Sequence, residues 1–341
     1  MMTSSSDDFK ASLEAYLADE TGTDVRITAM TPLAGGASRD SWAFTAEIDG
    51  DVQHLVLRKD FPTTMNEQAL TRQQEFQLMN AAYESGVKVA RMRFQSDDPA
   101  ILGLPFFIMD FVQGVSIGRK VIKSPELAVA RDRLAPQMAE QLALIHRMDP
   151  AAHGIDFLDG PADGVSPAQY VLDHTYAVLD ELGVNSPPFE FALRWCADHQ
   201  PTTHAVTFVH GDFRLGNLLV DAHGLAAVID WEFGHIGDPL EEIGYLCMRD
   251  WRFGNDHLHA AGVAHRETFI TAYEQHSGTS VDRAAVDWWE IIGNIRWGVI
   301  CLAQAERHLS GKDPSVELAS LGRRSAEMQL EVLHLIEKVG I

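Results

Sequence analysis

The sequence predicts an α+β chain in two parts: a smaller N-terminal part built on an antiparallel sheet, and a larger, mostly helical C-terminal part. Two observations carry this prediction. Before about residue 113, short stretches alternate apolar and polar residues and are separated by turns that contain glycine, which is typical of strands. From about residue 124 onward, long segments carry apolar residues at helical spacing instead.

The N-terminal part is expected to hold five strands, a short leading helix and one longer helix. The expected strands cover residues 25–29, 41–48, 54–57, 90–95 and 106–112, and the helices cover residues 9–18 and 66–85. The C-terminal part is expected to hold helices over residues 127–147, 167–182 and 189–199, and several more from residue 240 to the end.

The composition is ordinary for a soluble protein, with 46% hydrophobic and 22% charged residues. The net charge of −22 opposes nucleic acid and anionic membranes as partners, because both require phosphate neutralisation by Lys and Arg. Cys196, Cys247 and Cys301 are odd in number and widely spaced, which favours buried thiols in a reducing compartment. The first residues lack the features of a secretory signal. We therefore expect a cytoplasmic protein, and the sequence makes no prediction about oligomeric state.

The most informative stretch runs from His210 to Asn217 as His-Gly-Asp-Phe-Arg-Leu-Gly-Asn, and Val-Ile-Asp-Trp-Glu follows at residues 228–232. Between them, the apolar residues 218–220 and 226–229 predict two short strands joined by a turn. Such a hairpin would bring the loop that carries Asp212 and Asn217 beside Asp230.

These side chains suit phosphoryl transfer. Mg²⁺ prefers oxygen ligands and usually takes one or two carboxylates together with substrate phosphates. Asn217 and Asp230 are therefore the predicted metal ligands, which leaves Asp212 to face a substrate hydroxyl as the catalytic base. His210 is expected to brace the loop by hydrogen bonding rather than to titrate during the reaction.

A second candidate site lies at residues 33–40, between the first two predicted strands. The adjacent Gly35 and Gly36 allow backbone N–H groups to approach phosphates closely, and Ser38 can add a hydroxyl donor. The same residues also suit a plain hairpin turn, so the phosphate-binding interpretation depends on the motifs that follow.

The order of these motifs resembles the catalytic loop of the protein-kinase-like fold. His-Gly-Asp, Asp-Trp-Glu and the later Gly-Asp-Pro at residues 237–239 are similar to the forms found in the aminoglycoside phosphotransferase and choline kinase superfamily. They especially resemble bacterial phosphotransferases related to the kinase domain fused to some acyl-CoA dehydrogenases. The resemblance implies a bilobal fold, with an ATP-binding lobe over residues 1–113, a hinge near residues 109–114 and a catalytic lobe over residues 114–341.

The resemblance also implies a cation on the third strand for the phosphates of ATP, held by a glutamate on the next helix. Its register puts Arg58 at the position where the family carries lysine, with Glu75 as the partner. A slip of one residue would point Lys59 inward instead, so both cations stay candidates.

Three further roles follow from the same resemblance. The backbone of Asp110, Phe111 and Val112 is expected to contact adenine, although this apolar run is equally typical of an ordinary buried strand. Arg214 would face the transferring phosphate, and Asp238 would brace the loop through backbone N–H groups.

Only eight residues separate Asp230 from Pro239, which leaves no room for the long segment with which protein kinases bind peptides. We therefore expect a small hydroxylated molecule as the phosphate acceptor. An antibiotic-modifying kinase and a catalytically silent nucleotide-binding regulator are the alternatives. The candidates for an acceptor pocket, each of which also suits core packing, are Tyr245, Trp251, Arg252, Trp288, Trp289 and Trp297.

Overall fold

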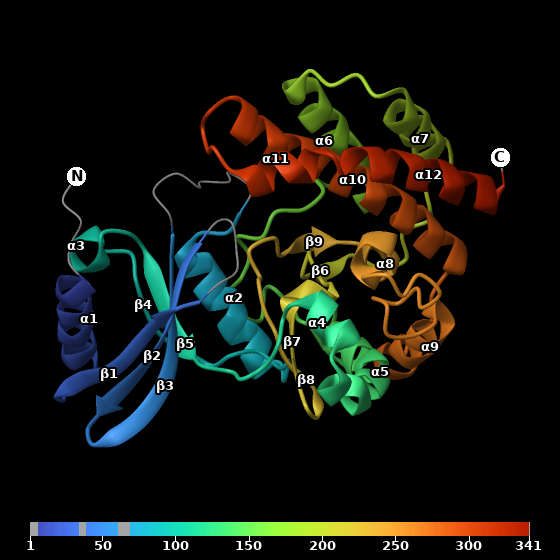
Figure 1. Cartoon of the computed structure of the whole chain (residues 1–341). Coiled ribbons are helices and arrows are strands. Elements are labelled where there is room, and N and C mark those ends of the chain that lie inside the picture. The colour runs from blue at the N-terminus through green and yellow to red at the C-terminus, as the bar shows by residue number, and fades with distance from the viewer. Residues whose placement is uncertain (1–5, 34–38, 61–68, 341) are drawn as a thin grey trace. The chain divides into compact units, whose positions relative to one another are not determined.

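The computed structural model describes residues 6–33, 39–60 and 69–340, and the chain divides into two compact units (Figure 1). The first unit comprises residues 1–114, 151–157 and 226–233. The second comprises residues 115–150, 158–225 and 234–341. Each unit has its own hydrophobic core, so each is described separately below.

The first unit is built on a five-stranded antiparallel sheet, as predicted. Its strands are β1 (Val25–Pro32), β2 (Arg39–Ile48), β3 (Asp51–Asp60), β4 (Met92–Ser96) and β5 (Phe106–Asp110), in the order β1-β2-β3-β5-β4. Asp49 and Gly50 join β2 to β3, with φ angles of 51° and 82°. Such positive φ angles are typical of a two-residue hairpin turn.

Three helices accompany this sheet: α1 (Ser6–Thr21), α2 (Arg72–Glu84) and the short α3 (Pro99–Leu102). The first lies along the sheet beside β1 (Figure 1) and packs Leu13 and Leu17 into one core with Leu55 and Leu57 of β3. Because side chains alternate along a strand, Leu57 and Lys59 face α1 while Arg58 faces the opposite side. Accordingly, the Lys59 ammonium lies 4.9 Å from the centre of the Phe9 ring.

The helix predicted from residue 66 begins later, at Arg72. Thr71 forms a capping box with Gln74: its side chain accepts from the Gln74 N–H, and the Gln74 side chain accepts from the Thr71 N–H. Ala69 and Leu70 lie outside the helix, and residues 66–68 fall outside the described part of the chain. The apolar pattern alone placed the start of the helix too early, because that pattern does not show where the N-cap lies.

The second unit is mostly helical. Its helices are α4 (Gly118–Lys123), α5 (Ala128–Ile145), α6 (Pro167–Leu182), α7 (Pro187–Asp198), α8 (Pro239–Cys247), α9 (Arg266–Ser277), α10 (Arg283–Leu309), α11 (Val316–Gly322) and α12 (Ser325–Val339), with short 3₁₀ turns η1 (Pro125–Leu127), η2 (Leu215–Asn217) and η3 (Arg249–Arg252). The long α10 lies beside α12 (Figure 1). Trp288 and Trp289 of α10 are buried in the core, where the Trp288 indole donates to the Cys196 carbonyl at 2.9 Å.

Two small sheets interrupt the helices. The predicted hairpin is present, as β7 (Leu218–Asp221) pairs with β8 (Gly224–Val228). A second pair, β6 (Thr207–Val209) with β9 (His235–Gly237), was not predicted. Each of these strands has only three residues, too few to show an alternating pattern. All three cysteines are buried, and no helix in the described ranges has the length and apolar character of a membrane span.

Candidate functional site

The loop with the most informative motif is supported at both ends within the second unit. It begins where β6 ends at Val209, turns through η2, and leads into β7 at Leu218. The partner of β6 is β9, which ends one residue before Asp238, the N-cap of α8. The motif at residues 210–217 and the Gly-Asp-Pro motif are therefore joined through one small sheet.

Glu242 of α8 holds the start of this loop. Its carboxylate accepts from the backbone N–H groups of His210, at 3.0 Å, and Gly211, at 3.1 Å. It also contacts Nε2 of His146 at 2.9 Å, and only 2% of the residue is exposed. The ring of His210 is fully buried, and its Nδ1 accepts from the Asp212 N–H at 3.3 Å. Sequence reasoning assigned Glu242 no role, although an acid in the first turn after Gly-Asp-Pro was a usable signal.

Replacing Glu242 with alanine is expected to lower the free energy of unfolding by about 2–4 kcal/mol. The change removes the acceptor from two backbone N–H groups, and each buried donor without a partner costs about 1–3 kcal/mol. Urea unfolding measures the effect, with Glu140→Ala as the control, since Glu140 lies exposed on α5. Equal stability of the two variants would contradict a bracing role for Glu242.

The Asp212 carboxylate is the centre of a hydrogen-bonded group and is 8% exposed. It accepts from Nε of Arg214 at 2.9 Å and from Nδ2 of Asn217 at 2.5 Å. Nδ2 of Asn217 also reaches the Asp212 carbonyl at 3.0 Å. Since the amide nitrogen of Asn217 is committed to Asp212, the amide oxygen is the atom that suits a hard cation.

Three aromatic residues lie beside this group. The Tyr245 hydroxyl is hydrogen-bonded to Asp212, and burial, followed by the charge of Asp212, raises the pKa of Tyr245 well above its usual value. The Arg214 guanidinium lies over the Trp251 ring, 4.7 Å from its centre. Trp251 packs against Tyr245 and Trp297 with ring centres 5.4 and 5.0 Å apart. Two of the six predicted pocket candidates, Tyr245 and Trp251, therefore contact Asp212 and Arg214, and Trp297 contacts Trp251. All five aromatic candidates belong to the C-terminal core or pack against it.

The first unit holds a separate charged group around Arg58. This guanidinium donates to Glu75 at 3.3 Å and to Asp230 at 2.5 Å. Burial by itself would lower the pKa of Arg58, but the carboxylates of Glu75, Asp230 and Glu232 raise it above its usual value. Glu75 is fully buried and also binds Arg72, which sequence reasoning missed. Of the two candidate cations on β3, Arg58 is therefore the one that contacts Glu75, while Lys59 lies on the opposite face of the sheet.

Asp230 has a left-handed backbone, with φ of 69°. This conformation is uncommon for residues other than glycine and persists only where the surroundings enforce it. Hydrogen bonds on both sides do so: the Val228 N–H donates to the Lys88 carbonyl at 2.7 Å, and the Glu232 carbonyl accepts from Leu70 at 3.0 Å. The Trp231 indole adds a bond to the Val228 carbonyl at 3.1 Å. Such strain is typical of functional sites.

The remaining predicted nucleotide contacts are placed as follows. The Asp110 N–H donates to the Arg91 carbonyl and the Phe111 N–H to the His54 carbonyl, each at 2.9 Å. These two N–H groups are engaged within the first unit, so the carbonyl groups of residues 110–112 and the Val112 N–H stay the candidates for the predicted adenine contact. Gly35, Gly36 and Ser38 lie outside the described residues.

Asp238 caps α8 by accepting from the Leu240 N–H at 2.9 Å. Burial raises the pKa of its carboxyl to about 6, and the neighbouring charge of Glu241 contributes in the same direction. Because the folded-state pKa lies above the unfolded value, the folded state binds more protons between about pH 4 and pH 6. The free energy of unfolding should therefore fall as the pH rises through this window.

Replacing Asp238 with asparagine is expected to remove this loss. Asparagine is an equally good N-cap and cannot ionise, so the variant should gain about 1–3 kcal/mol relative to the wild type between pH 4 and pH 7. Urea unfolding across that range measures the gain. Asp282→Asn, at the exposed N-cap of α10, controls for the exchange of one capping group for another. A constant difference across the range would contradict the inferred titration.

Comparison with known proteins identifies the family and the fold. The family model for the phosphotransferase enzyme family, APH, matches residues 29–289. The chain is 29% identical over 202 residues to acyl-CoA dehydrogenase family member 10 of Mus musculus, a stretch that covers 58% of this chain and 18% of that protein. The chain spans less than a third of the length of the curated relatives that it matches.

Solved structures share the fold. An aminoglycoside phosphotransferase candidate from Ralstonia eutropha JMP134 has a TM-score of 0.75 at 24% identity, over 96% of this chain and 98% of that one. A thermostable mutant of aminoglycoside phosphotransferase APH(4)-Ia, solved with ADP and hygromycin B, has a TM-score of 0.60 at 15% identity, over 95% and 98% of the two chains. The predicted fold and the resemblance seen in the motifs are confirmed. Since the family model matches well over half of the sequence, the chain belongs to the phosphotransferase enzyme family.

Proposed function

We propose that the protein transfers the γ-phosphoryl group of Mg·ATP to a hydroxyl group of a small molecule. The observation that carries this proposal is the arrangement around Asp212, whose carboxylate accepts from Arg214 and Asn217 in a loop braced by Glu242. Such a carboxylate can accept or orient the proton of an acceptor hydroxyl. Family membership and the nucleotide in the APH(4)-Ia complex support the same reaction.

The residues present suit a bound Mg²⁺. The amide oxygen of Asn217 and the carboxylate of Asp230 are hard oxygen donors, and substrate phosphates usually supply the other ligands. Bound Mg²⁺ would neutralise charge on the phosphate oxygens during transfer. Phosphoryl transfer passes through a loose transition state, so the side chains of this protein would mainly position the reactants and neutralise the charge of the phosphates.

Two arginines are assigned to the phosphates. Arg214, held by Asp212 and by the Trp251 ring, would face the transferring group. Arg58, held by Glu75, would contact the α- and β-phosphates in place of the lysine found in the family. Arginine binds phosphate oxygens with two parallel N–H groups, whereas lysine acts as a point charge, so the geometry of this contact should differ from that in relatives with lysine.

Release of ADP tests the proposal. Purified protein with Mg·ATP is offered a panel of hydroxylated metabolites and hydroxylated antibiotics, and ADP is measured for each. Release that depends on one acceptor identifies both the activity and the substrate. Nucleotide binding without ADP release on any acceptor would contradict the proposal and favour a silent regulator.

A further inference from the structure

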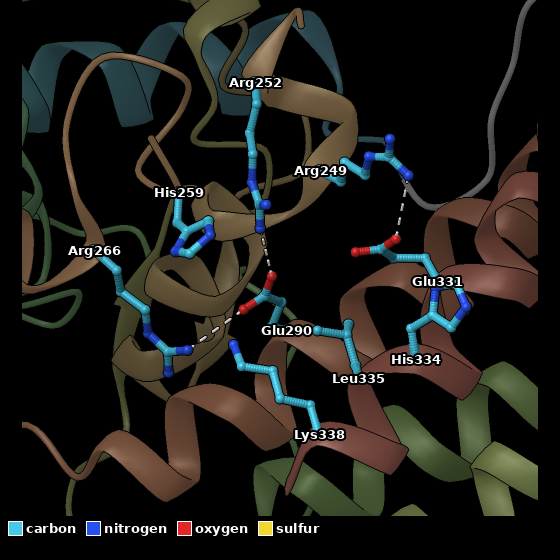
Figure 2. A pocket seen from close by; sticks show the side chains of 9 residues that line it. All are labelled: Arg249, Arg252, His259, Arg266, Glu290, Glu331, His334, Leu335 and Lys338. Atoms are coloured by element: carbon cyan, nitrogen blue, oxygen red, sulfur yellow. Dashed lines mark hydrogen bonds and ion pairs between the residues drawn. The ribbon is translucent and has the colours of Figure 1, made fainter. Parts of the chain in front are cut away.

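A pocket rich in positive charge lies in the second unit, in a chain where acidic residues outnumber basic ones by 49 to 27. Its volume is about 280 Å³, and four cationic side chains line it: Arg249, Arg252, Arg266 and Lys338. They come from η3, the start of α9 and the end of α12. Figure 2 shows Arg252, Arg266 and Lys338 pointing toward one carboxylate, Glu290 of α10.

The acids that line this pocket are outnumbered and already engaged. Glu290, which is 3% exposed, binds Arg252 at 2.9 Å and Arg266 at 3.5 Å (Figure 2). Glu331 binds Arg249 at 3.8 Å. Among the side chains that line the pocket, four Lys or Arg residues therefore face two carboxylates.

Donors remain available for a ligand. Lys338 is exposed and forms no ion pair in the described part of the chain, although its charge acts on Glu290. Nε of Arg266 is buried without a hydrogen-bond partner in the same part of the chain, although its terminal nitrogen binds Asp287 at 2.5 Å. Arg249 binds Asp256 at 2.9 Å outside the pocket. An anion that entered the pocket would meet the exposed Lys338 and Arg249 first, with Arg252 buried behind them.

The same short turn connects this basic pocket to the catalytic loop. Arg249 and Arg252 are the two ends of η3, and Trp251 between them lies under Arg214. A second pocket of about 590 Å³ shares Arg249 and Glu331 with the first, so the two hollows adjoin. A volume of 280 Å³ is small for a whole ligand but suits one end of a longer molecule.

We propose that the basic pocket binds an anionic group, a phosphate or a carboxylate, carried by the phosphate acceptor. This inference rests on the proposed function and adds the charge class of the substrate. A polycationic acceptor such as an aminoglycoside would meet Arg249, Arg252 and Lys338 as like charges, which disfavours it here. The acceptor should therefore carry a hydroxyl group together with a negatively charged end.

Binding of pyrophosphate to the full chain tests the pocket without any turnover. Calorimetry compares wild-type protein with Lys338→Gln, and Lys312→Gln, another exposed lysine, is the control. Loss of one charge-assisted contact should weaken pyrophosphate binding about tenfold in Lys338→Gln and leave it unchanged in the control. Equal affinity in all three proteins would overturn the proposal.

Turnover then tests the link to the acceptor. Acceptors are compared as sets of one skeleton: a neutral alcohol, the corresponding hydroxylated carboxylic acid and the corresponding hydroxylated phosphate ester. We expect a lower KM for one of the anionic members and a rise of about tenfold in that KM in Lys338→Gln, with kcat unchanged. Whether the KM of the carboxylic acid or that of the phosphate ester rises in Lys338→Gln shows which anionic group the pocket binds. An unchanged KM in Lys338→Gln would overturn the assignment of the pocket to the acceptor. If pyrophosphate binding depended on Lys338 but no acceptor were turned over, the proposed function would be contradicted and the anion-binding pocket would be supported.

Discussion

Replacing Asp212 with asparagine is expected to lower kcat by about 10²–10⁴-fold, the range typical of losing a general base. Asparagine has nearly the same size, so the change removes the charge and one acceptor function while the loop keeps its shape. Arg214 and Asn217 both donate to this carboxylate, and an amide can accept from only one side. The result is read as acceptor-dependent ADP release under saturating Mg·ATP.

Nucleotide binding shows whether Asp212→Asn loses turnover through the chemical step or through damage to the fold. Asp212→Asn should bind ADP as the wild type does, because Asp212 is assigned to the acceptor hydroxyl. Asp221→Asn is the matched control, since Asp221 lies in the β7–β8 turn, where its side chain accepts from the His223 N–H at 2.7 Å and asparagine can do the same. If Asp212→Asn turned over as fast as Asp221→Asn, Asp212 would have no role in the reaction.

The charged pair on β3 shows what a pattern can predict and where it stops. The resemblance put Arg58 at the lysine position and left Lys59 as the alternative, because a strand pattern gives two faces without saying what lies on each. The structure places Lys59 at the Phe9 ring of α1 and Arg58 at Glu75 of α2. That distinction depends on which helix covers which face of the sheet, which is a tertiary fact.

The residues that sequence reasoning missed share a physical cause. Glu242 is 31 and 32 positions from the N–H groups that it binds, and Arg72 joins Glu75 on its own helix to Asp60 at the end of β3. The Glu242 bonds and the Arg72–Asp60 bond join different elements, so residue spacing does not report them, whereas the Arg72–Glu75 pair has ordinary i,i+3 helix spacing. By contrast, the order of Asp212, Asn217 and Asp230 was readable because the hairpin between them is local.

Asp230 combines two properties that its sequence context does not reveal. Its backbone is left-handed, and its carboxylate is bound by Arg58, which Glu75 holds in turn. The Arg58 guanidinium would hold this carboxylate in place before a cation arrives. A left-handed backbone at an aspartate lowers the stability of the fold and is typical of residues with a functional role. This favours the assignment of the Asp230 carboxylate as a metal ligand.

Replacing Asp230 with asparagine is therefore expected to lower turnover at least about 100-fold at saturating acceptor, since loss of outer-shell partners alone typically costs 10–100-fold. The Mg²⁺ concentration for half-maximal activity should rise as well. Asparagine tolerates the left-handed backbone nearly as well as aspartate does, so the fold should persist. The measurement is a Mg²⁺ titration of ADP release.

The turn between β2 and β3 supplies the matched control. Asp49 is also an aspartate with a left-handed backbone in the first unit, with φ of 51°, but it lies in an exposed hairpin turn. Asp49→Asn makes the same chemical change in the same backbone conformation, so it should leave the Mg²⁺ titration unchanged. If the two variants behaved alike, the strain at Asp230 would serve the fold, and the metal ligand would have to be sought elsewhere.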